Sequence, residues 1–259
     1  MTTGSGSTPP AAAEVADFAA RRLDVLARIA RAAALAGRDP AGVTLVAVSK
    51  TVPAERLVAA VAAGLTVLGE NRVQEGEQKR PLVTGARWHL IGPLQANKAR
   101  RAIRTYDVVQ SVDSVDVAGR LDRLATEEHG PGWRLPVLLQ VNVDRDPGKA
   151  GFDPAGLGAG LAELLELPGL RIDGLMTVGR FVDDPEDARA TFRRLRELAA
   201  ELRALDGRLG GELSMGMSAD FEVAVEEGAT IVRVGRTLFG ERSRATVADP
   251  ADLADPAGP

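Results

Sequence analysis

A lysine that directly follows an apolar run is the strongest candidate for chemistry in this sequence. Residues 43–48 (VTLVAV) form a short run rich in β-branched residues, and Lys50 lies just beyond it. A lysine in a water-poor site loses its proton more easily, and its amine can then attack an aldehyde to form a Schiff base. Lys50 could equally be a solvated loop charge, because most lysines are exposed.

Two loops near the C-terminal end have the composition of a phosphate site. In the segment 214–220 (SMGMSAD), Met217 and Ser218 precede an expected helix. The Ser218 hydroxyl would cap that helix and, with the N–H groups that follow, form an anion site. In the segment 233–236 (RVGR), Gly235 would let a ligand approach the backbone closely. Taken singly, Ser218 could be only a helix cap and Gly235 only a turn.

One small molecule would satisfy both features. An aldehyde that carries a phosphate could react with Lys50 and be held by Ser218 and Gly235. Pyridoxal 5′-phosphate (PLP) is such a molecule. A sugar phosphate processed by a lysine-dependent aldolase is another, and residue type and spacing leave both interpretations open.

The elements that must position these residues alternate regularly. A long amphipathic helix comes first and ends at Gly37. The expected strands are 43–48, 65–68, 88–91, 108–111, 137–143, 170–176, 212–215 and 231–234. The expected helices are 53–63, 72–82, 95–103, 115–128, 154–165, 185–205 and 219–226, and a short element follows the last strand. This pattern predicts an α/β protein with a single (β/α)8 (TIM) barrel and an extra N-terminal helix.

In such a barrel the active site lies at the carboxyl ends of the strands. Lys50 follows the first expected strand, and Ser218 and Gly235 follow the seventh and eighth. Barrels often bind phosphate with those last two loops. The position of these two residues therefore favours a phosphate site over a separate cap and turn.

Composition excludes several other classes of site. The chain has no Cys, which rules out disulfides, thiolate metal sites and a Cys nucleophile. The only histidines are His89 and His129, so no metal site is expected. Lys and Arg number 32 against 36 Asp and Glu, which argues against a nucleic-acid binder. The sequence shows neither a membrane span nor a signal peptide, so we expect a cytoplasmic protein.

The chain ends are expected to be flexible tails. Residues 1–12 are rich in Gly, Ser, Thr and Pro, and residues 244–259 are rich in Ala, Asp and Pro. The barrel is expected to span residues 13–243.

Other polar residues have plain structural explanations. The basic run 97–101 is typical of a solvated helix face, although an anionic partner stays open. The acid pairs at 183–184 and 226–227 are expected to be solvated. His89 lies inside an apolar strand, as a core histidine with one hydrogen bond would, or it contacts a ligand at the barrel mouth.

Six motifs, in their order and spacing, resemble those of the pyridoxal phosphate homeostasis protein family. They are LVAVSKTVP (45–53), GENRVQE (69–75), WHLIGPLQANK (88–98), GLMTVG (174–179), LSMGMSADFEVAVEEG (213–228) and VRVGRTLFGER (232–242). The resemblance implies a fold type III PLP barrel, like the N-terminal domain of alanine racemase, with PLP bound covalently to Lys50. It also implies a carrier or regulator of the PLP pool rather than an enzyme, with PLP-dependent apoenzymes as possible recipients.

The resemblance extends to single positions. In alanine racemase a serine after strand seven binds the phosphate, and an arginine in an R-x-G motif faces the pyridine nitrogen. Ser218, Arg233 and Gly235 match these positions. We prefer the nitrogen to the phosphate as the contact of Arg233. Asn71 and His89 are expected near the cofactor ring, or else they hold loops in place.

Two positions depart from the family pattern. Arg72 stands where a tyrosine is usual, and Arg236 stands where a serine or threonine is usual. A hydroxyl contact to the phosphate is therefore lost at position 236. The backbone N–H and guanidinium of Arg236 and the hydroxyl of Thr237 are the expected substitutes.

Two other functions remain as hypotheses. One is a PLP enzyme such as a weak amino-acid racemase, which needs a base within reach of the substrate Cα. Alanine racemase also needs a second domain, for which this chain leaves no length, and a partner subunit that supplies an acid/base residue. A carrier needs no site completed by a dimer, so we expect a monomer. The other is a lysine-dependent sugar-phosphate lyase, which would form a borohydride-trapped adduct with its substrate and show no cofactor colour.

Overall fold

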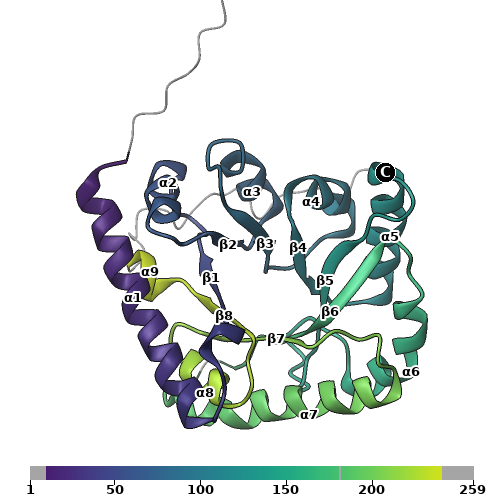
Figure 1. Ribbon diagram of the computed structural model, residues 1–259. Coiled ribbons are helices and arrows are strands. Elements are labelled where there is room, and N and C mark those ends of the chain that lie inside the picture. Colours follow the sequence, from purple (N-terminus) through teal and green to yellow (C-terminus); the bar gives the residue numbers. More distant parts are fainter. Residues whose placement is uncertain (1–9, 181, 241–259) are drawn as a thin grey trace, which may run out of the picture.

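The computed structural model describes residues 10–180 and 182–240. Its eight strands are parallel, each pairs with the next along the chain, and β8 pairs with β1, so the sheet closes into a barrel (Figure 1). The strands are β1 (Thr44–Val48), β2 (Val67–Glu70), β3 (Arg87–Leu90), β4 (Val108–Val112), β5 (Leu135–Gln140), β6 (Leu170–Met176), β7 (Glu212–Met217) and β8 (Ile231–Val234). The predicted (β/α)8 barrel is confirmed.

Helices surround the barrel and follow the strands in turn (Figure 1). They are α1 (Ala12–Leu35), α2 (Ala54–Ala62), α3 (Val73–Lys79), α4 (Ala99–Thr105), α5 (Val115–His129), α6 (Pro154–Leu165), α7 (Arg189–Leu205), α8 (Phe221–Glu226) and α9 (Arg236–Phe239). Short 3-10 turns, η1 (Pro40–Gly42), η2 (Ala96–Lys98) and η3 (Pro185–Ala188), precede β1, α4 and α7. Residues 1–9 and 241–259, which contain most of the two expected tails, lie outside the described residues.

The extra helix α1 packs along the outside of the barrel against α2, α8 and α9. Its buried face consists of Phe18, Val25, Ile29, Ala32 and Ala33, as the amphipathic pattern of the sequence predicts. Gly37 follows the helix with a φ of 65°, a conformation that glycine adopts at little cost. The predicted end of the helix is confirmed.

Local signals place other helix starts correctly. The Ser114 hydroxyl accepts the Val117 N–H at 3.3 Å at the start of α5. The Asp153 carboxylate accepts two N–H groups of the first turn of α6, which begins at Pro154. These caps satisfy N–H groups that have no partner inside the helix.

Of the eight strands described, six differ from their predicted bounds, and β2 and β5 differ most. Strand β2 begins at Val67, two residues later than expected, and the buried Leu65 lies ahead of it. The strand continues to Glu70, which pairs with Leu90 of β3. Strand β5 ends at Gln140 rather than at residue 143. The chain folds back after it, so that the Asn142 N–H donates to the Phe152 carbonyl at 3.0 Å.

The core has two layers. Apolar side chains fill the space between strands and helices, and Trp88 is the largest fully buried side chain there. A separate cluster of Val46, Leu138, Met176 and Ile231 joins strands from opposite sides of the sheet, so it fills the barrel interior. Because side chains fill its interior, the barrel can hold the residues at its strand ends in fixed positions.

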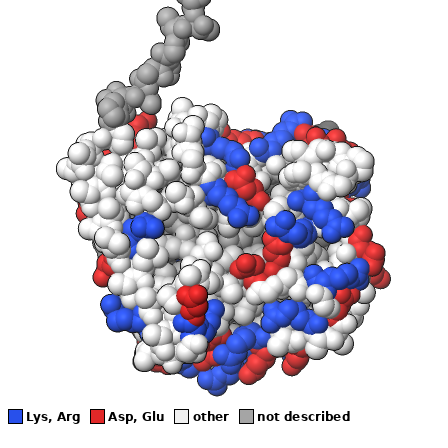
Figure 2. Space-filling model, in the orientation of Figure 1, with Lys and Arg blue, Asp and Glu red and all other residues white. Residues whose placement is uncertain are grey.

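The surface carries charges of both signs. Figure 2 shows Lys and Arg side chains mixed with Asp and Glu over the face in view. In the basic run 97–101, Arg100 pairs with Glu127 at 2.6 Å and also with Glu128, and Arg101 pairs with Glu77. These ion pairs link α4 to α5 and α3. No helix within the described residues is long and apolar enough to cross a bilayer.

Candidate functional site

The main cavity lies at the carboxyl ends of the strands, where the sequence predicts the site. Its volume is about 610 Å³, and residues that follow six of the eight strands contribute to its wall. The lining residues are Val48, Lys50, Asn71, Ile91, Val178, Arg180, Val182, Met217, Ser218, Ala219, Asp220, Arg233, Gly235 and Arg236. Of the predicted site residues, only His89 and Thr237 do not line it.

The lining is strongly cationic. Lys50, Arg180, Arg233 and Arg236 face a single carboxylate, that of Asp220. Asp220 is buried, which raises the pKa of its carboxyl, and its Oδ1 accepts the Met217 N–H at 2.6 Å. The excess of positive charge favours an anionic ligand.

Lys50 lies two residues beyond the end of β1 and is half-buried. The next residue, Thr51, has a φ of 65°, which is uncommon and costly for a β-branched side chain. The preceding residue, Ser49, is fully buried, and its hydroxyl donates to Glu70 Oε1 at 2.7 Å. The turn that carries Lys50 is therefore fixed on both sides of the lysine.

The loops after β7 and β8 meet at Ser218 and Gly235. The Gly235 N–H donates to the Ser218 hydroxyl oxygen at 3.0 Å. A Cβ added to Gly235 would lie 3.3 Å from the Cβ of Val48, so glycine allows β8 to pass close to the end of β1. The structure thus brings together the two residues that the sequence assigns to a phosphate site.

Ser218 is not the cap of the following helix, and that prediction is wrong. Helix α8 begins at Phe221, and Asp220 is the residue that precedes it. Gly216, with a φ of 88°, packs against Phe221 and Ala224, where an added Cβ would lie 2.5 Å from the Ala224 Cβ. A turn at residues 218–220 separates β7 from this helix, and the Ser218 hydroxyl accepts the Gly235 N–H from the loop after β8.

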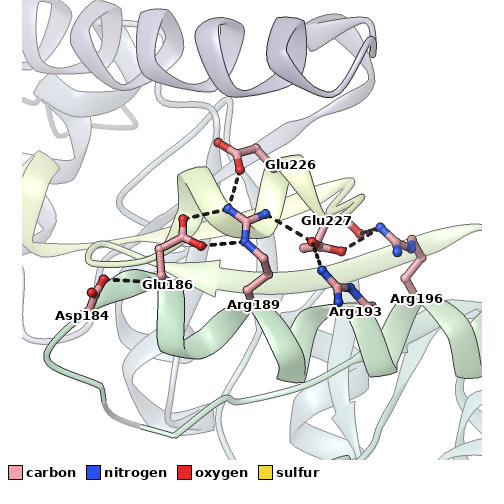
Figure 3. Close-up of polar contacts among 7 residues, drawn as sticks. All are labelled: Asp184, Glu186, Arg189, Arg193, Arg196, Glu226 and Glu227. Atoms are coloured by element: carbon pink, nitrogen blue, oxygen red, sulfur yellow. Dashed lines mark hydrogen bonds and ion pairs between the residues drawn. The ribbon is translucent and has the colours of Figure 1, made fainter.

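Ion pairs join the end of α8 to α7 (Figure 3). The Glu227 side chain is only 7% exposed and pairs with three arginines of α7. They are Arg189, Arg193 and Arg196, at 3.2, 3.4 and 2.8 Å. Arg189 also pairs with Glu226 at 2.6 Å. The expectation of a solvated acid pair at 226–227 is therefore wrong for Glu227, whereas the acids at 183–184 are exposed as expected.

Arg233 extends from β8 into a series of buried side chains that are joined by hydrogen bonds. Its guanidinium donates to the Ser214 hydroxyl oxygen at 2.6 Å and to the Thr177 carbonyl at 2.8 Å. Burial lowers the pKa of Arg233 to about 10, with Asp220 acting in the opposite direction, so the group is still charged at neutral pH. Because arginine has five N–H donors, these two bonds leave donors for a ligand.

His89 lies at the far end of the same series of hydrogen bonds. The Ser214 hydroxyl donates to Gln110 Oε1 at 2.6 Å, and Gln110 Nε2 lies 2.7 Å from His89 Nδ1. Burial, and then the charge of Arg87, lower the pKa of His89 to about 3, so the ring is neutral. An amide N–H that donates to Nδ1 places the ring proton on Nε2. His89 thus has the geometry of a core histidine with one hydrogen bond.

Asn71 follows β2 and is placed by the loop after β3. A Cβ added to Gly92 would lie 2.3 Å from the Asn71 carbonyl oxygen, so only glycine allows this contact. Arg72, which replaces the usual tyrosine, does not line the cavity. Its carbonyl accepts the Tyr106 hydroxyl at 2.9 Å.

Sequence reasoning did not select Arg180 or Asp220 for the site. Arg180 follows β6, so its place beyond a strand end was a usable signal. Asp220 gave no such signal, since it looks like an ordinary residue of a helix start. In the described residues, no group of three or more His, Asp or Glu side chains could hold a metal ion.

Comparison with known proteins assigns the family. Residues 23–243 match the family described as "Alanine racemase, N-terminal domain". The chain is 42% identical over 220 residues to the pyridoxal phosphate homeostasis protein of Aquifex aeolicus, covering 84% of this chain and 95% of the relative. The chain belongs to the pyridoxal phosphate homeostasis protein family. The relative from Pseudomonas aeruginosa is 45% identical over 221 residues and is covered to 93%.

Solved structures agree with this family. PipY of Synechococcus elongatus PCC7942 with PLP bound is 44% identical, covers 82% of this chain and is itself covered in full, with a TM-score of 0.73. An alanine racemase of Clostridium difficile 630 is 17% identical with a TM-score of 0.63, and 60% of that chain is covered. This second likeness concerns the barrel fold alone.

Proposed function

We propose that this protein binds PLP as a Schiff base on Lys50 and serves PLP homeostasis as a carrier rather than as an enzyme. The observation that carries the proposal is a single cavity that joins Lys50, Ser218, Gly235 and Arg233. A reactive amine, a hydroxyl, a close backbone approach and a buried cation suit an aldehyde with a phosphate and a pyridine ring. The likeness to PLP-bound PipY supports the same ligand.

Each end of the ligand has its own residues in this proposal. The Ser218 hydroxyl, the backbone at Gly235 and the backbone and guanidinium of Arg236 hold the phosphate, and the Thr237 hydroxyl lies one residue further. Arg233 donates to the pyridine nitrogen, which then acts as an acceptor and stays unprotonated. PLP with an unprotonated ring nitrogen is a weak electron sink, which suits storage better than carbanion chemistry.

Two further residues border the ring in this arrangement. Asn71 lies on the β2 side of the cavity and Met217, which is 36% exposed, on the β7 side. His89 acts only through Gln110 and Ser214, because it does not line the cavity.

Little in the wall of the cavity serves racemisation. Asp220 has the only carboxylate among the lining residues, and its Oδ1 already holds the Met217 N–H. The groups assigned to PLP above all lie on this chain, and we expect a monomer to be sufficient for the site. We place this carrier in the cytoplasm, with PLP-dependent apoenzymes as recipients.

The test is a titration of the purified apoprotein with PLP, followed by visible absorbance, and an assay of hydrogen exchange at Cα of bound L-alanine in D2O. The proposal predicts a saturable Schiff-base band and no exchange above the rate of free PLP. Catalysed exchange would support the weak racemase instead. An adduct with sugar phosphates and no band with PLP would support the lyase.

A further inference from the structure

A partly buried cluster of charged residues lies beneath the turn that carries Lys50. It consists of Glu70 at the end of β2 and of Glu75 and Lys79 on α3. We propose, on the premise that Lys50 is the attachment point of PLP, that Lys79 and Glu75 are positioning residues that set the Lys50 amine for Schiff-base formation. None of the three lines the cavity, so they act through the turn.

The two positioning residues hold the backbone on either side of Lys50. Lys79 Nζ donates to the Ser49 carbonyl at 2.9 Å, and Glu75 Oε2 accepts the Thr51 N–H at 2.9 Å. Lys79 and Glu75 also bind each other at 3.1 Å. One ion pair thus fixes the peptide groups before and after the lysine.

The turn needs such support because its backbone is strained. Thr51 has a φ of 65°, and β-branched residues rarely persist there unless their surroundings hold them. Without the bond to Glu75, Thr51 can relax to negative φ, which would redirect the Lys50 side chain that precedes it. The Val52 N–H donates to the Ser49 carbonyl at 3.0 Å and closes the turn, but it does not constrain Thr51 from outside.

The ion pair is itself anchored in the barrel. Glu70 is fully buried, and its Oε1 accepts both Lys79 Nζ at 2.8 Å and the Ser49 hydroxyl at 2.7 Å. Lys79 is only 12% exposed, so solvent competes weakly with these bonds. The close approach of Gly76 to Tyr106 fixes α3, since a Cβ at Gly76 would overlap the Tyr106 hydroxyl. Lys79 therefore links the turn that carries Lys50 to the end of strand β2.

The step that this arrangement serves is the condensation of an amine with an aldehyde. The neutral Lys50 Nζ attacks the aldehyde carbon and a C–N bond forms. The two protons of the amine pass to the aldehyde oxygen, which leaves as water, and a C=N bond remains. Geometry at Nζ affects the rate of this step far more than it affects the binding of the phosphate and the ring.

The experiment compares the wild type with Lys79→Met, Lys79→Arg and Glu75→Ala, and Lys98→Met on η2 is the matched control. Stopped-flow absorbance measures how fast the Schiff-base band forms after PLP is added to apoprotein. Non-covalent affinity is measured separately in Lys50→Ala and in the Lys50→Ala/Lys79→Met double variant. Circular dichroism and thermal melting establish that each variant is folded.

We expect Lys79→Met and Glu75→Ala to slow band formation by about 10- to 100-fold, and Lys79→Arg to retain most of the wild-type rate. Lys98→Met should match the wild type. The two Lys50→Ala proteins should bind PLP with equal affinity within about twofold, since their phosphate and ring contacts are the same. If Lys79→Met does not fold, Glu75→Ala is judged by the same criterion.

Two results would overturn the inference. One is wild-type rates of band formation in folded Lys79→Met and Glu75→Ala. The other is a loss of non-covalent affinity in the double variant as large as the loss of rate, which would assign Lys79 a general structural role. A wild-type protein that forms no band at all would instead refute the proposed function, so the two failures are distinguishable.

Discussion

The Ser218 hydroxyl joins the two loops that we assign to the phosphate, so its removal tests that assignment. It accepts the Gly235 N–H at 3.0 Å and keeps its own proton to donate into the cavity. We predict that Ser218→Ala weakens PLP binding. The variant loses a hydroxyl donor to a phosphate anion and, with it, the contact that fixes the Gly235 loop.

The magnitude follows from these two contacts. A hydrogen bond to a charged group contributes roughly 1.5–3 kcal/mol. In the variant, the released Gly235 N–H can itself turn to the phosphate and recover part of this energy. We therefore expect a net loss of about 1–3 kcal/mol, which corresponds to a Kd that is roughly 5- to 150-fold higher.

The assay uses the Lys50→Ala background, in which covalent attachment does not mask affinity. Equilibrium titration compares Lys50→Ala with Lys50→Ala/Ser218→Ala. Ser114→Ala in the same background is the matched control, since Ser114 also accepts a backbone N–H, from Val117 at 3.3 Å, but caps α5 away from the cavity. An unchanged Kd for the Ser218 variant, or an equal loss in the Ser114 variant, would refute the reasoning.

Three more predictions follow from the same structure. Lys50→Ala should remain folded but retain no PLP after borohydride reduction, and cofactor fixed to the variant would contradict the role of Lys50. His89 has its pKa lowered to about 3 by burial, so between pH 6.5 and 3 the unfolded chain binds one proton more, and stability falls as the pH falls through this range. In urea titrations His89→Asn should therefore lower the slope of unfolding free energy against pH by about 1.4 kcal/mol per pH unit, and an unchanged slope would show that His89 is charged in the fold. Light scattering should show a monomer, and a stable dimer would count against a site complete in one chain.

Most of the fold could be predicted because its signals are local. The bounds of α6, β6 and β8 agree with expectation, since each has a run of apolar residues between clear breaks. The bounds of β2 were harder to predict, because the residues Gly69 and Glu70 at its end are more typical of a loop than of a strand. Glu70 stays in the sheet because Lys79 and Ser49 satisfy its carboxylate, and those contacts lie outside the local pattern.

The site was predictable only to the extent that barrel topology places strand ends together. That rule located Lys50, Asn71 and Gly235 at one cavity. It could not show that Ser218 contacts the loop after β8 rather than capping α8, since the Gly235 N–H that it accepts lies 17 positions away. Nor could it show the chain from Arg233 to His89, which joins four strands through hydrogen bonds between residues far apart in sequence.

The ion pairs were the feature hardest to predict from the sequence. Glu227 looks like an ordinary helix-end acid, and only the packing of α7 against α8 surrounds it with guanidinium groups (Figure 3). The contacts of Lys79 and Glu75 were equally hard to predict, because the partners of both residues lie on a turn about 25 to 30 positions away.

The most direct test of the central claim is to reduce the PLP-loaded protein with borohydride and to map the modified peptide by mass spectrometry. Our account predicts that the visible band disappears and that one phosphopyridoxyl group is found on Lys50. Modification of another lysine, or no stable modification of the loaded protein, would contradict it.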